Sequence, residues 1–107
     1  MNLQISPTEL AEKLRATQPP HLLDVREREE HDFVALPHST LIPLGEIGAR
    51  ADELAEWRDE EIVVYCHHGI RSLRAIAQLK HFGFTNLQNL AGGIDRWSEE
   101  VDAALPR

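Results

Sequence analysis

The most informative segment of the chain reads Ile62-Val63-Val64-Tyr65-Cys66-His67-His68-Gly69-Ile70-Arg71-Ser72. It begins with an apolar, largely β-branched run typical of a buried strand, and residues 73–82 that follow it have apolar side chains at helical spacing. Cys66, the only cysteine in the chain, therefore lies where a strand gives way to a glycine-containing loop and then a helix.

This position predicts a nucleophilic thiol at Cys66. Backbone N–H groups and the positive end of a helix dipole would point at the sulfur and favour the thiolate, which is the reactive form. The alternative is a small buried hydrophobic residue. The polar and cationic residues after Cys66 favour the reactive interpretation, in an electropositive and partly exposed setting.

Strands and helices alternate on both sides of this segment. Ser6-Pro7-Thr8-Glu9 has the pattern of a capping box and predicts a helix that ends before Pro19. The remaining predicted elements are short strands over 22–25, 41–43 and 86–90, a helix over 46–57, and a last helical stretch that opens at Gly92-Gly93 and runs through Ile94 and Trp97 toward Val101. This order predicts an α/β fold with a central, mostly parallel sheet flanked by helices. Active sites of such sheets lie at the carboxyl ends of strands, where both Asp24 and Cys66 fall.

Length and composition indicate one ordinary globular domain over residues 1–107. The chain is 42% hydrophobic and 27% charged, with a formal net charge of -7 from 11 basic and 18 acidic residues. This acidic balance argues against nucleic-acid binding, and we expect no membrane span or signal peptide. A lone cysteine forms no internal disulfide, so we expect a cytoplasmic protein, with a monomer as the default. The acidic runs at 27–30 and 59–61 are predicted to be solvated surface, with a docking patch for a basic partner as the alternative.

Three blocks of the sequence resemble the rhodanese family of single-domain sulfurtransferases. They are Leu23-Asp24-Val25-Arg26-Glu27, Cys66-His67-His68-Gly69-Ile70-Arg71-Ser72 and Ala91-Gly92-Gly93-Ile94-Asp95-Arg96-Trp97, in the family's order and at its usual separations. The resemblance covers nearly the whole chain. The end of the chain also resembles bacterial rhodanese domains, including those fused to E1-like adenylating enzymes.

The resemblance implies a persulfide mechanism without a metal or organic cofactor. Cys66 would take the outer sulfur of a small anionic donor, with thiosulfate as the expected one, and pass it to cyanide or a thiol. The spacing Cys-x4-Arg from Cys66 to Arg71 matches sulfurtransferases, whereas related phosphatases use Cys-x5-Arg, so phosphate or arsenate chemistry is the weaker hypothesis. Two further alternatives are a sulfur-relay protein, which would receive sulfur from a protein donor and serve a sulfur-carrier protein, and an inactive interaction module.

The resemblance also assigns roles to the loop after Cys66, although several stay open. Gly69 would adopt a backbone conformation closed to other residues, so that the loop's N–H groups point at the sulfur. Arg71 would bind the donor's oxygens or form an ion pair that holds the loop. Ser72 would cap the following helix or offer its hydroxyl to the sulfur, and we favour the cap.

The other candidate residues are assigned to the pocket entrance or to the scaffold. His67 and His68 are expected to project in different directions and to line the entrance beside Ile70, which gives a zinc site little support. Asp24 and Arg26 are expected to brace the loops as a bidentate pair. The remaining predicted supports are a cap or a local ion pair at Glu30, a tight turn at Gly92 and Gly93, and core anchors at Trp57 and Trp97, while His21, His31, His38 and His81 are interpreted as surface or boundary residues.

One segment departs from the family's pattern. Residues 33–40 stand where rhodanese domains usually have Gly-His-Ile-Pro-Gly-Ala. Pro37 is kept, but both glycines are replaced, with Ser39 in the place of the second. We expect the fold to survive this change and the loop's orientation to differ.

Overall fold

The centre of the molecule is a five-stranded parallel sheet, seen in a computed structural model that describes residues 3–106. The strand order is β1-β5-β4-β2-β3, and every pairing within the described residues is parallel. This confirms the predicted α/β class. The strands are β1 (Gln4–Ile5), β2 (His21–Asp24), β3 (Thr40–Leu41), β4 (Ile62–Tyr65) and β5 (Leu87–Leu90).

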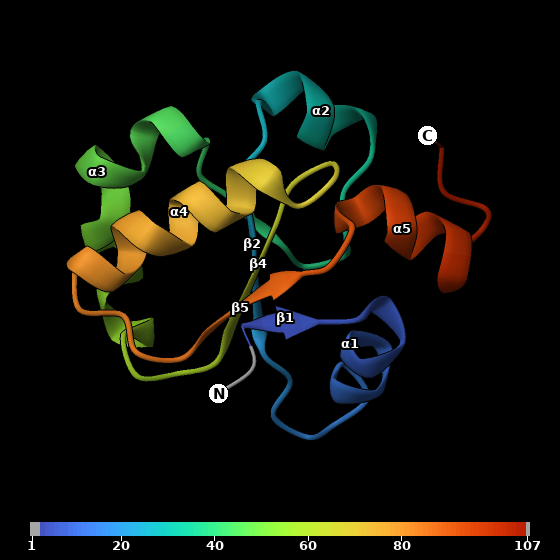
Figure 1. Ribbon diagram of the computed structural model, residues 1–107, viewed down its shortest axis with the longest axis horizontal. Helices are drawn as coiled ribbons and strands as arrows, with labels where there is room; N and C mark the ends of the chain where they lie inside the picture. The colour runs from blue at the N-terminus through green and yellow to red at the C-terminus, as the bar shows by residue number, and fades with distance from the viewer. Residues whose placement is uncertain (1–2, 107) are drawn as a thin grey trace.

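Helices cover both faces of this sheet. Figure 1 shows α3 and α4 on one side, α1 and α5 on the other, and α2 at the top of the view. The helices are α1 (Pro7–Lys13), α2 (Arg28–Phe33), α3 (Ile47–Arg50), α4 (Ile70–His81) and α5 (Gly93–Glu100), with short 3₁₀ helices η1 (Leu44–Glu46) and η2 (Ala51–Trp57) on either side of α3.

Strand β4 lies in the middle of the sheet and faces two separate cores. Val64 and Cys66 pack in the core beneath α3 and α4, whereas Val63 and Tyr65 pack in the core beneath α1 and α5. Successive side chains of a strand point to opposite faces, so a strand covered on both sides is apolar at every position. Cys66 extends this alternation by one residue and is thereby aimed toward α4.

The first helix begins as predicted. In its capping box, Ser6 N–H donates to the Glu9 carboxylate at 3.0 Å and Glu9 N–H donates to Ser6 Oγ at 3.2 Å. Two predicted boundaries are wrong. Helix α4 begins at Ile70, three residues before the predicted start, and residues 46–57 are α-helical only at Ile47–Arg50, since Gly45 and Gly48 weaken an α-helix.

Two elements were not predicted. Strand β1 has two residues, and α2 buries none of its side chains, so neither has a periodic apolar pattern. Helix α5 covers Gly93–Glu100, close to the extent predicted for the last helix.

The segment without the family's glycines is held by Tyr65. The Leu36 N–H donates to the Tyr65 hydroxyl at 3.1 Å, and Ser39 Oγ lies 2.9 Å from the same oxygen. His38 takes the left-handed conformation there, with φ of 64°. The serine that replaces a glycine therefore supplies a hydrogen bond to a tyrosine buried at the end of β4.

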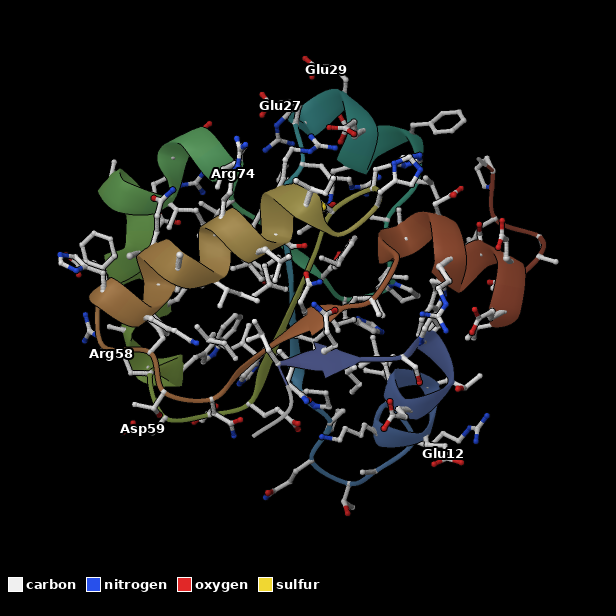
Figure 2. All side chains as sticks on the ribbon, viewed as in Figure 1. Glu12, Glu27, Glu29, Arg58, Asp59 and Arg74 are labelled. Atoms are coloured by element: carbon white, nitrogen blue, oxygen red, sulfur yellow. The ribbon has the colours of Figure 1, made fainter. Side chains whose placement is uncertain are left out.

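Whereas Asp24 and Arg26 are buried, most charged side chains lie at the periphery of the molecule. Figure 2 shows Glu12, Glu27, Glu29 and Asp59 in such positions, and all four are exposed. Glu30 differs from its neighbours because it turns inward and is only partly exposed. Within residues 3–106, no helix combines the length and apolar character needed to cross a membrane.

Candidate active site

The sulfur of Cys66 lies at the amino end of α4 and accepts hydrogen bonds from its backbone. The Gly69 N–H donates to Sγ at 3.0 Å and the Ser72 N–H at 3.4 Å. Gly69 is the N-cap residue of α4, with φ of 103° and no capping side chain. Ser72 is the third residue of this helix, so the sulfur takes the place that an N-cap oxygen usually occupies. The predicted role of Gly69 as a left-handed residue is confirmed.

Opposing effects set the ionisation of Cys66. Burial raises the pKa of its thiol, since the residue is only 2% exposed. Hydrogen bonds from the Ser72 hydroxyl and from the N–H groups of Ser72, Gly69 and His68 lower the pKa and outweigh burial, so the net pKa lies below that of an ordinary cysteine. The predicted electropositive setting is present, but the expected partial exposure is not. A donor must therefore enter the loop to reach the sulfur.

Ser72 does not cap the helix, contrary to the prediction. Its Oγ lies 3.4 Å from Cys66 Sγ and is also hydrogen-bonded to Oδ1 of the buried Asn89 on β5. A hydroxyl has one proton to donate, so its bonding follows the state of the sulfur. A Cys66 thiol donates to Ser72 Oγ, whereas a thiolate accepts from it. Asn89 in turn donates to Gln4 Oε1 at 2.9 Å.

The outer side of the cysteine loop is held by α5. The Ile94 N–H donates to the Cys66 carbonyl at 2.9 Å, and the Asp95 N–H donates to the His67 carbonyl at 3.1 Å. These bonds pair the carbonyls of Cys66 and His67 with donors on α5. The N–H groups of the loop are then free to point at the sulfur. The contact requires Gly93, because a Cβ there would lie 2.3 Å from the His67 carbonyl oxygen.

Arg71 forms a bidentate ion pair with Glu30 of α2. Its two terminal nitrogens donate to the carboxylate at 2.7 and 2.8 Å. Hydrogen bonding from Arg71 lowers the pKa of Glu30 to about 2. Two roles were predicted for Arg71: binding the donor's oxygens, or forming an ion pair that holds the loop. The structure contains the ion pair, with Glu30 as the partner of Arg71.

Asp24 and Arg26 form the predicted brace beneath this pair. Asp24 is fully buried and accepts from the Arg26 side chain at 2.9 and 2.8 Å. Arg26 also donates to the Val34 carbonyl, which ties β2 to the end of α2. His31 joins the brace through Nδ1, 2.8 Å from the Asp24 carboxylate. The interpretation of His31 as an ordinary boundary residue is wrong, because the position depends on the unpredicted helix α2.

The two histidines do not diverge, contrary to the prediction. The rings of His67 and His68 lie with their centroids 4.1 Å apart in a T-shaped arrangement. His67 is partly buried, whereas His68 and Ile70 are exposed. Of the predicted loop residues, Gly69 and Ser72 contact the Cys66 sulfur, whereas the side chains of His68 and Ile70 are exposed.

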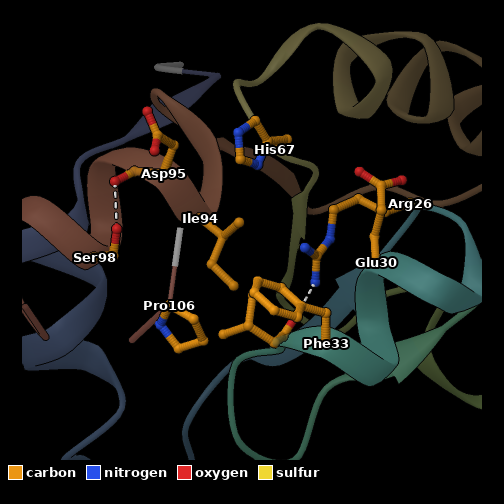
Figure 3. Close-up of a pocket in the computed structure, with 9 residues that line it drawn as sticks. Arg26, Glu30, Phe33, His67, Ile94, Asp95, Ser98 and Pro106 are labelled. Carbon is orange, nitrogen blue, oxygen red and sulfur yellow. Dashed lines mark hydrogen bonds between the residues drawn. The ribbon is translucent and has the colours of Figure 1, made fainter. Parts of the chain in front are cut away.

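Beside the loop is a pocket between α2, α5 and the end of the chain. Figure 3 shows His67 on its upper wall, Arg26 and Glu30 opposite Asp95, and Phe33 and Pro106 below. Its lining combines the charged side chains of Arg26, Glu30 and Asp95 with apolar ones.

Comparison with known proteins establishes the class to which this site belongs. The sequence model of the Rhodanese-like domain matches residues 6–100. The chain therefore belongs to the rhodanese-like domain family.

The relatives include proteins of similar and of greater length. The putative sulfurtransferase YtwF of Bacillus subtilis is 34% identical over 98 residues, which cover 92% of each chain. The adenylyltransferase and sulfurtransferase uba4 of Ogataea parapolymorpha is 36% identical over 89% of this chain and 24% of its own length. The putative sulfur carrier protein YrkF of Bacillus subtilis is 35% identical over 92% of this chain and 52% of its own length. The chain thus spans about a quarter to a half of these two longer relatives.

Solved structures agree with this assignment. A rhodanese-related protein from Thermoplasma volcanium superposes with a TM-score of 0.80 at 35% identity, covering 92% of each chain. The human single-domain sulfurtransferase TSTD1 gives a TM-score of 0.79 at 28% identity, covering 94% of this chain and 98% of its own.

Proposed function

We propose that the chain is a sulfurtransferase that moves sulfane sulfur through a persulfide on Cys66. The observation that carries this proposal is the pair of N–H bonds from Gly69 and Ser72 to Sγ, at 3.0 and 3.4 Å. These donors stabilise a thiolate before the reaction. They would equally stabilise the terminal anion of a persulfide.

In the first step, the Cys66 thiolate attacks the outer sulfur of thiosulfate. A sulfur–sulfur bond forms at Cys66, the sulfur–sulfur bond of thiosulfate breaks, and sulfite leaves with the bonding electron pair. Arg71 uses two of its N–H donors for Glu30, and the others can bind the sulfonate-like oxygens of the donor.

In the second step, a nucleophile attacks the terminal sulfur of the persulfide. Cyanide leaves as thiocyanate, or a thiolate leaves as a new persulfide, and Cys66 returns to its thiolate. Neither step needs an external oxidant or reductant. In this proposal the loop's backbone N–H groups stay directed at Cys66 throughout the two steps.

The test is to incubate the reduced protein with thiosulfate and measure its intact mass. We expect a gain of one sulfur atom that is released by cyanide, and no gain in Cys66→Ser. A thermal melt of the variant checks that it is folded. A sulfur gain that survives Cys66→Ser would overturn the proposal.

A second candidate function is a sulfur relay that receives its sulfur from a protein. The exposed apolar side chains of Ile70, at 68%, and Phe33, at 64%, favour it, because they flank the active-site loop and the neighbouring pocket. The similarity to a putative sulfur carrier protein points the same way.

The two functions differ in their donor. A relay would show little mass gain with thiosulfate but rapid gain from a cysteine desulfurase carrying a persulfide, and Ile70→Ser would slow only the second reaction. A thiosulfate enzyme would load readily from thiosulfate, and Ile70→Ser would leave that rate unchanged. Failure to load from either donor would contradict both.

A further inference from the structure

Three metal-ligating side chains meet at the outer edge of the active-site loop. His67 and His68 follow Cys66 directly, and Asp95 lies in the first turn of α5. Each side chain offers one ligand atom, and these atoms all lie within 4.8 Å of one another. The persulfide chemistry proposed above uses none of these side chains.

The backbone beneath this cluster is held in place. Asp95 N–H donates to the carbonyl of His67 at 3.1 Å, so the carboxylate and the first imidazole stand on two hydrogen-bonded residues. The close approach of Gly93 to the same carbonyl leaves little room for the two segments to shift. His67 and Asp95 are both partly buried, whereas the His68 side chain is 64% exposed. The backbone that carries the cluster is therefore held in place.

One ligand separation in the cluster already matches the spacing of two ligands on a metal ion. His68 Nε2 lies 3.4 Å from Asp95 Oδ2. A charge-assisted hydrogen bond between such groups would be about 2.7–2.9 Å long. Two ligands of a tetrahedral zinc ion, with bonds of about 2.0–2.1 Å, stand about 3.4 Å apart.

We propose that His67, His68 and Asp95 bind one divalent transition-metal ion. Two imidazoles and a carboxylate are ligands that Zn²⁺ accepts, and three protein ligands leave a further position open to water or an anion. The ligand atoms all lie within 4.8 Å of one another and would have to come to about 3.4 Å from one another around a tetrahedral ion. The ion would join the loop that carries Cys66 to the start of α5.

The test is a calorimetric titration with Zn²⁺, followed by absorption spectra with Co²⁺. Full-length Cys66→Ser is the parent, because the thiolate would bind these metals itself. His68→Gln and Asp95→Asn each remove one ligand. His81→Gln is the matched control, since His81 is an exposed histidine at the far end of α4. Thermal melts of the metal-free proteins check folding.

We expect the parent and His81→Gln to bind one Zn²⁺ per chain with equal affinity. His68→Gln and Asp95→Asn should each weaken binding at least about tenfold, since even loss of an outer-shell partner costs 10–100-fold. Failure of the parent to bind Zn²⁺, or equal affinities in all four proteins, would overturn the proposal. The titration uses a protein without Cys66, so its result does not depend on whether the protein transfers sulfur.

Discussion

The pKa of Cys66 depends on which groups donate hydrogen bonds to its sulfur. Two backbone N–H groups and one hydroxyl surround a thiol that is otherwise buried. The N–H groups are fixed by the fold of the loop. The Ser72 hydroxyl is the donor that a single substitution can remove.

We predict that Ser72→Ala raises the pKa of Cys66. The hydroxyl is the largest of the effects that lower this pKa, after the opposing effect of burial. A hydrogen bond to a charged group contributes about 1.5–3 kcal/mol, so alkylation by iodoacetamide at neutral pH should slow about tenfold. The measurement is the alkylation rate against pH, whose inflection should move upward. An unchanged inflection would show that the backbone donors alone set the pKa.

Several residues of the site could not be read from the sequence because they come from elsewhere in the chain. Asn89 reaches Ser72 from β5, the strand that pairs with β4. His31 reaches Asp24 from α2. An isolated asparagine in a short strand and a histidine in a charged segment carry no local signal. Only strand pairing and helix placement bring them to the site.

At the scale of elements, the junction between α5 and the cysteine loop controls the geometry of the site. Ile94 and Asp95 donate their N–H groups to the loop, and this contact is possible only without a side chain at Gly93. Gly93 also has φ of 66°, a conformation that disfavours residues with a Cβ.

We predict that Gly93→Ala destabilises the protein by about 2 kcal/mol or more and slows loading of Cys66 with sulfur. Its Cβ would meet backbone atoms, which cannot move aside as a flexible side chain can. Gly48→Ala is the matched control, because it lies in α3 with nothing within 4 Å of its Cβ. That variant should be neutral or more stable by up to about 1 kcal/mol. Urea unfolding compares the two variants. Equal midpoints for Gly93→Ala and Gly48→Ala would show that the contact at Gly93 does not require a glycine.

At the scale of the whole molecule, ion pairs join segments that the sheet alone does not connect. The Glu30–Arg71 pair links α2 to the start of α4, and the Asp24–Arg26 pair links β2 to the end of α2. Together these two pairs hold α2 and the start of α4 in place at the carboxyl ends of the strands.

We predict that the Glu30–Arg71 pair makes stability depend on acid pH. The pKa of Glu30 falls from 4.5 to about 2 in the folded protein, so the pair's contribution is complete above pH 4.5 and is lost as the pH falls toward 2. Glu30→Gln should therefore be less stable than the parent at pH 7, and the difference should shrink between pH 4.5 and 2.

Urea unfolding at pH 7, 4.5 and 3 measures this dependence. Glu29→Gln is the control, since Glu29 is an exposed neighbour on the same helix that points away from the protein (Figure 2). It should follow the parent at each pH. If the difference in unfolding free energy between Glu30→Gln and the parent stayed constant with pH, the lowered pKa of Glu30 would not be the source of the pH dependence.

The sequence by itself determined the class of fold and the centre of the site. An apolar run that ends on Cys66, a glycine three residues later and a helical repeat after it are local patterns, and each follows from backbone preferences and burial. The same holds for the capping box at Ser6. The Asp24–Arg26 pair was expected from the resemblance to the rhodanese family, and its members lie two residues apart.

Only the tertiary structure decided what surrounds the sulfur. The sequence did not predict the start of α4, because the N-cap residue Gly69 has no side chain to cap the helix. The sulfur of Cys66, three residues earlier, accepts the hydrogen bond from the Ser72 N–H instead. Likewise, Ser72 faces Asn89, Arg71 pairs with Glu30, and the two histidines meet Asp95 because of how the helices lie on the sheet. These contacts join residues far apart in the chain. Their geometry depends on packing, which local sequence patterns do not encode.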